Sequence, residues 1–256
     1  MSADGKAPPA AGPVRETGRD AAELEALLAL PPARPDRTLR YGAHPSQVTD
    51  LYGEGPPRLA LLHGGFWREA YDRAHLAPLA AALARRGTPV ALVEYRRVGG
   101  GGGWPETFED VAAALGSLPG EDAVVLAGHS AGGQLALWAA ACAPQRVART
   151  VAVAPVADLG RAAELGTGGH AVAQFLGSSR LERLLPGPDP VRLPVPAAPV
   201  TLVHGEDDTQ VPPELSAAYV EHSGARLESW PGVGHYAPVT AGSPAAERLS
   251  ALLVSR

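Results

Sequence analysis

Short apolar segments alternate with longer helical segments along most of this chain, and this alternation constrains the fold more than any other feature. The helical segments are rich in Ala and Leu, and Pro105, Pro213 and Pro244 stand where a first helical turn tolerates proline. Such alternation is typical of a mostly parallel sheet covered on both faces by helices. We therefore expect an α/β protein. The eight expected strands lie at 38–41, 47–52, 58–63, 90–95, 123–127, 150–154, 200–204 and 226–230, and the helices between them at 72–86, 105–118, 131–143, 213–223 and 244–254.

Two segments depart from this alternation. Residues 1–36 begin with a stretch of Pro, Ala and charged residues, which is typical of a flexible tail, and a short surface helix is expected over 21–30, before Pro31-Pro32. Residues 157–198 are rich in Gly, Pro and Arg and separate two expected strands, as a cap or lid over a site does. The sequence thus predicts one domain over 37–256 with a small cap insertion at about 157–198.

Charge and composition argue against several classes of partner. The formal net charge is −5, whereas binding to a phosphate backbone needs a basic surface, so we expect no nucleic-acid partner. Cys142 is the only cysteine, which excludes an internal disulfide and a thiolate metal cluster. No apolar run approaches the roughly 20 residues needed to cross a bilayer, and the first residues lack the apolar centre of a secretion signal. We expect a cytoplasmic protein without a membrane partner; no coiled-coil pattern specifies an oligomeric state.

One serine occupies a sequence typical of a catalytic nucleophile. Residues 128–132 read GHSAG and match G-x-S-x-G, with Ser130 at the centre, after an apolar strand and before a helix. In such a turn the flanking glycines remove side chains that would collide with the neighbouring strand and helix, and the serine hydroxyl is left exposed at the sheet edge. The alternative is a glycine-rich turn without a catalytic role, but the placement of the motif between a strand and a helix favours Ser130 as nucleophile.

A serine hydroxyl needs a base to take its proton and a carboxylate to orient that base. Among the eight histidines, His235 is the best candidate for the base, because it lies in the loop PGVGHYAP after the last expected strand. Asp208 ends the run HGEDD after the preceding strand and is the favoured orienting acid, with Asp207 and then Glu206 as alternatives. The chain order Ser, Asp, His differs from the orders found in the chymotrypsin and subtilisin folds.

A third motif follows an earlier strand. Residues 63–67 read HGGFW, and their glycines let backbone N–H groups approach a substrate oxygen. We expect the N–H groups of Gly65, Phe66 and Ala131 to form an oxyanion hole, with His63 organising the loop. Phe66 and Trp67 are candidate substrate contacts, although both are equally typical of a core.

Together these motifs resemble the α/β-hydrolase superfamily: HGGFW at 63–67, GHSAGG at 128–133, HGEDDTQVP at 204–212 and GHY at 234–236. HGG-x-W, together with YGAHPSQVTDLY at 41–52, resembles the kynurenine formamidase (arylformamidase) and related carboxylesterase branch. The resemblance implies an α/β-hydrolase fold and hydrolysis of an ester or aryl formamide through an acyl-serine, without a metal or organic cofactor. Gln134 departs from the pattern, because many relatives carry histidine there.

The expected partner is accordingly a small-molecule ester or amide substrate, such as an N-formylkynurenine-like formamide. Two alternatives remain open at this point. One is a ligand-binding homologue without turnover, since a fold does not establish an activity. The other is a small peptidase, for which this chain shows no additional docking domain.

Overall fold

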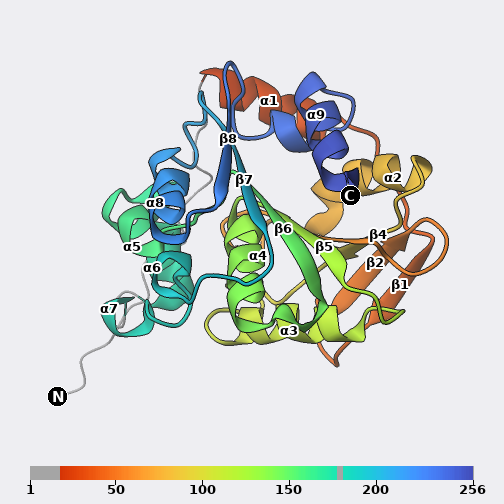
Figure 1. Cartoon of the computed structure of the whole chain (residues 1–256), viewed down its shortest axis with the longest axis horizontal. Helices are drawn as coiled ribbons and strands as arrows, with labels where there is room; N and C mark the ends of the chain where they lie inside the picture. Colours follow the sequence, from red (N-terminus) through yellow and green to blue (C-terminus); the bar gives the residue numbers. More distant parts are fainter. Residues whose placement is uncertain (1–17, 178–180, 256) are drawn as a thin grey trace.

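The computed structural model describes residues 18–177 and 181–255 and contains one eight-stranded sheet with the order β1-β2-β4-β3-β5-β6-β7-β8 (Figure 1). β1 and β2 pair antiparallel, as do β2 and β4, whereas the remaining neighbouring pairs, from β4–β3 to β7–β8, are parallel. The expected mostly parallel α/β sheet is confirmed. The strands are β1 Arg37–Arg40, β2 Val48–Tyr52, β3 Leu59–Leu62, β4 Val90–Val93, β5 Val124–His129, β6 Val147–Val153, β7 Val200–Gly205 and β8 Arg226–Trp230.

The central strands are apolar at every position because both of their faces are covered. β3 reads LALL and all four residues are buried. Ala60 and Leu62 contribute to one core, and Leu59 and Leu61 to another on the opposite face. This split follows from the two-residue period of a strand. The unbroken apolar run therefore indicates a strand between two layers of helices.

Helices cover both faces of the sheet (Figure 1). α3 Glu106–Ser117, α4 Ala131–Cys142 and α8 Glu214–Ser223 pack on one face, and their buried side chains join the core that contains Leu62. α2 Ala77–Arg85 and α9 Pro244–Val254 pack on the other face, with the core that contains Leu61, and Leu27 of α1 Gly18–Leu28 joins the same core. The connections after β3 and β5 leave the sheet toward opposite faces, which opens a crevice at the carboxyl ends of these two strands.

The segment between β6 and β7 forms α5 Leu159–Glu164, α6 Thr167–Leu176 and α7 Leu181–Leu184. α6 packs on the loop after β3: the rings of Phe175 and Trp67 stack with centroids 4.4 Å apart. Arg68 Nη2 donates to the carbonyl oxygen of Gly168 at 2.6 Å. This insertion is thus tied to the HGGFW loop by an aromatic stack and a charged donor, and its role as a cap stays a prediction.

The helix near the N-terminus, α1, was expected on the surface, but it is partly buried. Residues 1–17, part of the expected flexible tail, lie outside the described residues, whereas α1 begins at Gly18, earlier than expected. Asp20 and Leu27 of α1 are buried, because the helix packs across the end of the sheet that carries the candidate site. The division into a tail over 1–36 and a domain over 37–256 stays a prediction.

Candidate active site

Ser130 stands in a sharp turn between β5 and α4, with φ 56° and ψ −120°. A non-glycine residue holds such a conformation only where its surroundings impose it. A Cβ at Gly128 would lie 2.0 Å from the carbonyl oxygen of Gly132, and a Cβ at Gly132 would lie 2.3 Å from that of His63. Only glycine fits at these two positions. The motif therefore places Ser130 in the crevice at the carboxyl end of β5.

Asp208 and His235 follow β7 and β8 and are directly paired. Asp208 Oδ2 lies 2.6 Å from His235 Nδ1, and Asp208 Oδ1 accepts the N–H groups of Gln210 at 2.9 Å and Val211 at 2.8 Å. Burial by itself would raise the pKa of Asp208, but His235, together with His204, holds that pKa well below its usual range. Asp208 is thus an ionised acceptor aimed at the histidine ring.

Asp207 and Glu206, the sequence-based alternatives, point elsewhere. The Asp207 side chain is 44% exposed and forms an ion pair with Arg19 at 2.9 Å. Glu206 is also exposed. Of the three acids in this run, only Asp208 is buried.

Ser130 and His235 line one small cavity of about 110 Å³. His235 is buried, and its carbonyl oxygen accepts a hydrogen bond from His129 Nε2 at 2.9 Å. The cavity thus contains the candidate nucleophile and the candidate base. Its full lining is Leu24, Leu27, Leu28, Gly65, Phe66, Arg68, Tyr71, His75, His129, Ser130, Gln210, His235 and Tyr236.

The HGGFW loop passes directly against Ser130. A Cβ at Gly64 would lie 2.9 Å from the Cβ of Ser130, and Gly65 has φ 106°, which favours glycine. Gly65 and Phe66 line the cavity, and Ala131 is the first residue of α4, next to Ser130. All three expected oxyanion donors are therefore near the serine; that their N–H groups bind an oxyanion stays a prediction.

A sequence model described as "Alpha/beta hydrolase family" matches residues 59–190, which is more than half of the chain. The chain belongs to this α/β-hydrolase family. A search of curated proteins found no match.

Solved structures with this fold include several esterases. Esterase B from Lactobacillus rhamnosis is 22% identical, with a TM-score of 0.70 over 92% of this chain and 90% of that one. Carboxyl esterase 2 from the mycorrhizal fungus Tuber melanosporum is 19% identical, with a TM-score of 0.66 over 84% of this chain and 83% of that one. At such identities these likenesses show the α/β-hydrolase fold, in agreement with the sheet order described above.

Two positions that the sequence analysis singled out, Trp67 and Gln134, support the structure of this α/β hydrolase and do not line the cavity. Trp67, expected beside Phe66 at the substrate, is fully buried in the core and does not line the cavity. Its backbone turn directs the indole under α6, where Nε1 donates to Gln134 Oε1 at 3.2 Å. Gln134 Nε2 in turn donates to the carbonyl oxygen of Pro188 at 2.8 Å. Gln134 therefore joins the HGGFW loop to the insertion between β6 and β7.

Sequence reasoning missed several residues of the cavity. His75 lies in the connection to α2, and burial, together with nearby His63, lowers its pKa to about 4. Burial likewise lowers the pKa of His129 well below its usual range. His129 stood inside the serine motif and could have been noted, whereas no local signal marks His75. Both side chains give the cavity uncharged imidazole walls near neutral pH.

The HGGFW loop of this hydrolase rests on a buried ionic network. His63 Nδ1 donates to the carbonyl oxygen of Gly64 at 2.8 Å, and His63 Nε2 lies 2.9 Å from Glu94 Oε1. Glu94 Oε1 also accepts from Arg97 Nη1 at 2.8 Å. Burial alone would raise the pKa of Glu94, but His63 and Arg97 outweigh it and lower that pKa to about 2. His63 thus has the anchoring position expected for a loop-organising residue.

Acid is therefore expected to destabilise the protein through Glu94. Because its folded-state pKa is about 2 and its ordinary value 4.5, its contribution to the free energy of unfolding is full above pH 4.5 and is lost as the pH falls toward 2. Glu94→Gln should lose about 3 to 5 kcal/mol at pH 7, since it leaves buried cations without their partner, and should show a shallower decline below pH 4.5.

Denaturant unfolding of both proteins between pH 7 and pH 3 tests this expectation. Glu247→Gln is the matched control, because the exposed Glu247–Arg86 pair should contribute about 1 kcal/mol or less. An equal decline with pH in wild type and Glu94→Gln would contradict the assignment.

Two further properties of the described residues bear on the site. They contain no group of three or more His, Cys, Asp or Glu side chains that could hold a metal ion. None of their helices is both long and apolar enough to cross a membrane.

Proposed function

We propose that this protein hydrolyses small carboxylic esters, with aryl formamides as a second substrate class, through an acyl-serine formed on Ser130. The observation that carries the proposal is the Asp208–His235 pair, joined at 2.6 Å, with His235 and Ser130 lining one cavity. A buried, ionised carboxylate on Nδ1 keeps Nε2 of the ring available as a base and stabilises the imidazolium formed during reaction.

In the first half of the reaction, His235 takes the proton of the Ser130 hydroxyl as its oxygen attacks the substrate carbonyl. The resulting oxyanion is stabilised by the N–H groups of Gly65, Phe66 and Ala131, each worth about 3 kcal/mol of transition-state stabilisation. His235 then returns the proton to the leaving alcohol or amine. In the second half, water activated by His235 releases the acid from Ser130.

The cavity dimensions support a small acyl group. At about 110 Å³ the cavity is well below the roughly 300 to 1,000 Å³ of sites that enclose drug-sized ligands. Leu28 and Tyr71, which are 65% and 42% exposed, lie at its rim. A formyl or short acyl group fits inside such a space, and a larger substrate group would extend past these two side chains.

Esters are favoured over formamides by the position of residues 41–52, which together with HGG-x-W carry the resemblance to the formamidase and carboxylesterase branch. Tyr41 donates to the carbonyl oxygen of Glu94 at 2.6 Å, and Gln47 donates to Asp110 at 2.7 Å, so this segment supports the sheet. None of these residues lines the cavity. Esterase B from Lactobacillus rhamnosis, which shares this fold, has been solved with a tributyrin phosphonate inhibitor.

Initial rates with p-nitrophenyl acetate, butyrate and octanoate and with N-formylkynurenine test the proposal, with Ser130→Ala giving the background. We expect kcat/KM to fall about tenfold or more between butyrate and octanoate, because the longer chain does not fit the cavity. A Ser130-dependent preference for N-formylkynurenine would instead assign the formamidase activity. Tight binding of these compounds without turnover would contradict the proposal and favour the ligand-binding alternative, and cleavage of peptide p-nitroanilides alone would favour a peptidase.

A further inference from the structure

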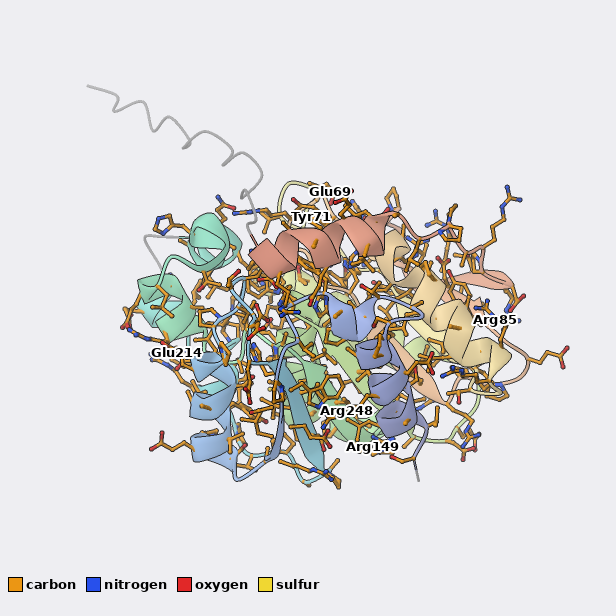
Figure 2. The ribbon with its side chains drawn as sticks, turned by 90° about the horizontal axis from the view of Figure 1, so that it is seen from above. Glu69, Tyr71, Arg85, Arg149, Glu214 and Arg248 are labelled. Atoms are coloured by element: carbon orange, nitrogen blue, oxygen red, sulfur yellow. The ribbon has the colours of Figure 1, made fainter. Side chains whose placement is uncertain are left out.

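One stripe of α1 faces the candidate active site. Its members are Asp20, Glu23, Leu24, Leu27 and Leu28, at helical positions i, i+3, i+4, i+7 and i+8, which share one face of a helix. The three leucines line the cavity that contains Ser130. Figure 2 shows α1 lying across the molecule beside the labelled Tyr71, which lines the same cavity.

Asp20 connects the two loops that carry the triad acid and base. Asp20 Oδ1 accepts the backbone N–H of His235 at 2.7 Å. Asp20 Oδ2 accepts the backbone N–H of Thr209, the residue after Asp208, at 2.8 Å, and also the Thr209 hydroxyl. This one fully buried carboxylate therefore sets the distance between the backbone next to Asp208 and the backbone of His235.

Glu23 holds the rest of the histidine loop. It accepts the backbone N–H groups of Gly234 at 2.9 Å, Tyr236 at 3.0 Å and Ala237 at 2.9 Å. A Cβ at Gly234 would lie 2.4 Å from Asp20 Oδ1 and 2.8 Å from Glu23 Oε2, so the close approach of loop and helix requires glycine there. Together the two carboxylates bind every backbone N–H group from 234 to 237.

A helix that only covers an apolar surface would not bury a carboxylate, because an unpaired buried charge is costly. Here the polar part of the stripe is directed at the groups flanking Asp208 and His235, and the apolar part at the cavity. We propose that α1 forms part of the active site and has two roles there. Asp20 and Glu23 are positioning residues for His235. Leu24 and Leu28 limit the size of the substrate group. The proposal rests on the proposed hydrolase function and adds a specificity element to it.

The positioning role is tested with Asp20→Asn and Glu23→Gln, which keep side-chain size. Glu25→Gln is the matched control, because Glu25 is exposed on the same helix and lies off the stripe. With p-nitrophenyl acetate we expect kcat to fall about 10- to 100-fold in the two variants, with KM changed far less, because small displacements of catalytic groups act on the chemical step. Glu25→Gln should match wild type.

Proton NMR of the His235 Nδ1–H in its short hydrogen bond to Asp208 reads the same geometry without any substrate. We expect this downfield resonance to shift or broaden in Asp20→Asn and to stay unchanged in Glu25→Gln. Wild-type kcat and an unshifted resonance in both Asp20→Asn and Glu23→Gln, even with a lowered melting temperature, would overturn the positioning role. If wild type hydrolyses none of the esters or formamides, the proposed function fails, whereas the NMR comparison still decides whether α1 positions His235.

The size-limiting role is tested with Leu24→Ala and Leu28→Ala. Leu165→Ala is the control, because Leu165 is exposed at the end of α5 and does not line the cavity. We expect the ratio of kcat/KM for p-nitrophenyl octanoate to that for the acetate to rise about fivefold or more in the first two variants, since truncation enlarges the cavity. The ratio should stay at the wild-type value in Leu165→Ala. An unchanged ratio in both Leu24→Ala and Leu28→Ala would overturn the assignment of these leucines.

Discussion

Ser130→Ala is expected to reduce ester hydrolysis by about a millionfold in kcat, to the level that binding and oxyanion stabilisation alone provide. The variant removes one oxygen and leaves a Cβ at the same strained backbone position, with φ 56°, so the turn between β5 and α4 keeps its shape. Turnover of p-nitrophenyl acetate and the melting temperature are measured together. The folded variant should bind substrate and release no nitrophenol above background.

Ser117→Ala is the matched control for this loss. Ser117 is exposed at the end of α3, where its hydroxyl donates to the carbonyl oxygen of Ala114, so its loss should leave turnover unchanged. A p-nitrophenyl phosphonate should add one covalent mass to the peptide containing Ser130 in wild type and none in Ser130→Ala. Turnover by a folded Ser130→Ala at the wild-type rate would require a different nucleophile.

Asp208→Asn is expected to lower kcat by about 10⁴-fold at neutral pH. The asparagine amide can donate to His235 Nδ1, which favours the tautomer with a proton on Nε2, and that nitrogen then cannot accept the serine proton. The low pKa of Asp208 has a second consequence: its ionised state, and with it the active tautomer, should persist well below the usual range for aspartate.

Asp207→Asn serves as the control, one position away in the same acidic run. Its side chain is largely exposed and pairs only with exposed Arg19 among the interactions described, so kcat should stay within about twofold of wild type. The two variants are compared by kcat and by denaturant unfolding at pH 7. A larger loss of kcat in Asp207→Asn than in Asp208→Asn would reverse the assignment of the orienting acid.

The strands and the three motif loops could be predicted because their signals are local. LALL at β3 and VALV at β4 are unbroken apolar runs that fit only a doubly covered strand. The glycines at 128 and 132 predict a sharp turn in which these two positions leave no room for a side chain, and the structure contains that turn. Parallel strands then bring the residues after β3, β5, β7 and β8 to one sheet edge, so the grouping of Ser130, Asp208 and His235 follows from the topology.

The role of α1 and the position of the Trp67 side chain could not be predicted from local signals. Trp67 follows Phe66 directly, yet φ 56° at Trp67 turns the chain so that the indole stacks on Phe175 of α6. Phe66, one position earlier, lines the cavity. Adjacent aromatic residues thus acquire different surroundings from a backbone turn and a distant helix, and neither is encoded in the local pattern.

By itself, the sequence determined the strands, the serine turn and the candidate serine and histidine, because two-residue periodicity, glycine geometry and chain order leave signals in short segments. Only the tertiary structure decided which acid faces the histidine and what closes the cavity. The Asp20 contacts join residues 189 and 215 positions apart, at Thr209 and His235. A carboxylate on a short N-terminal helix carries no local sign of its partners, since those N–H groups converge on it only once the sheet has brought their loops together.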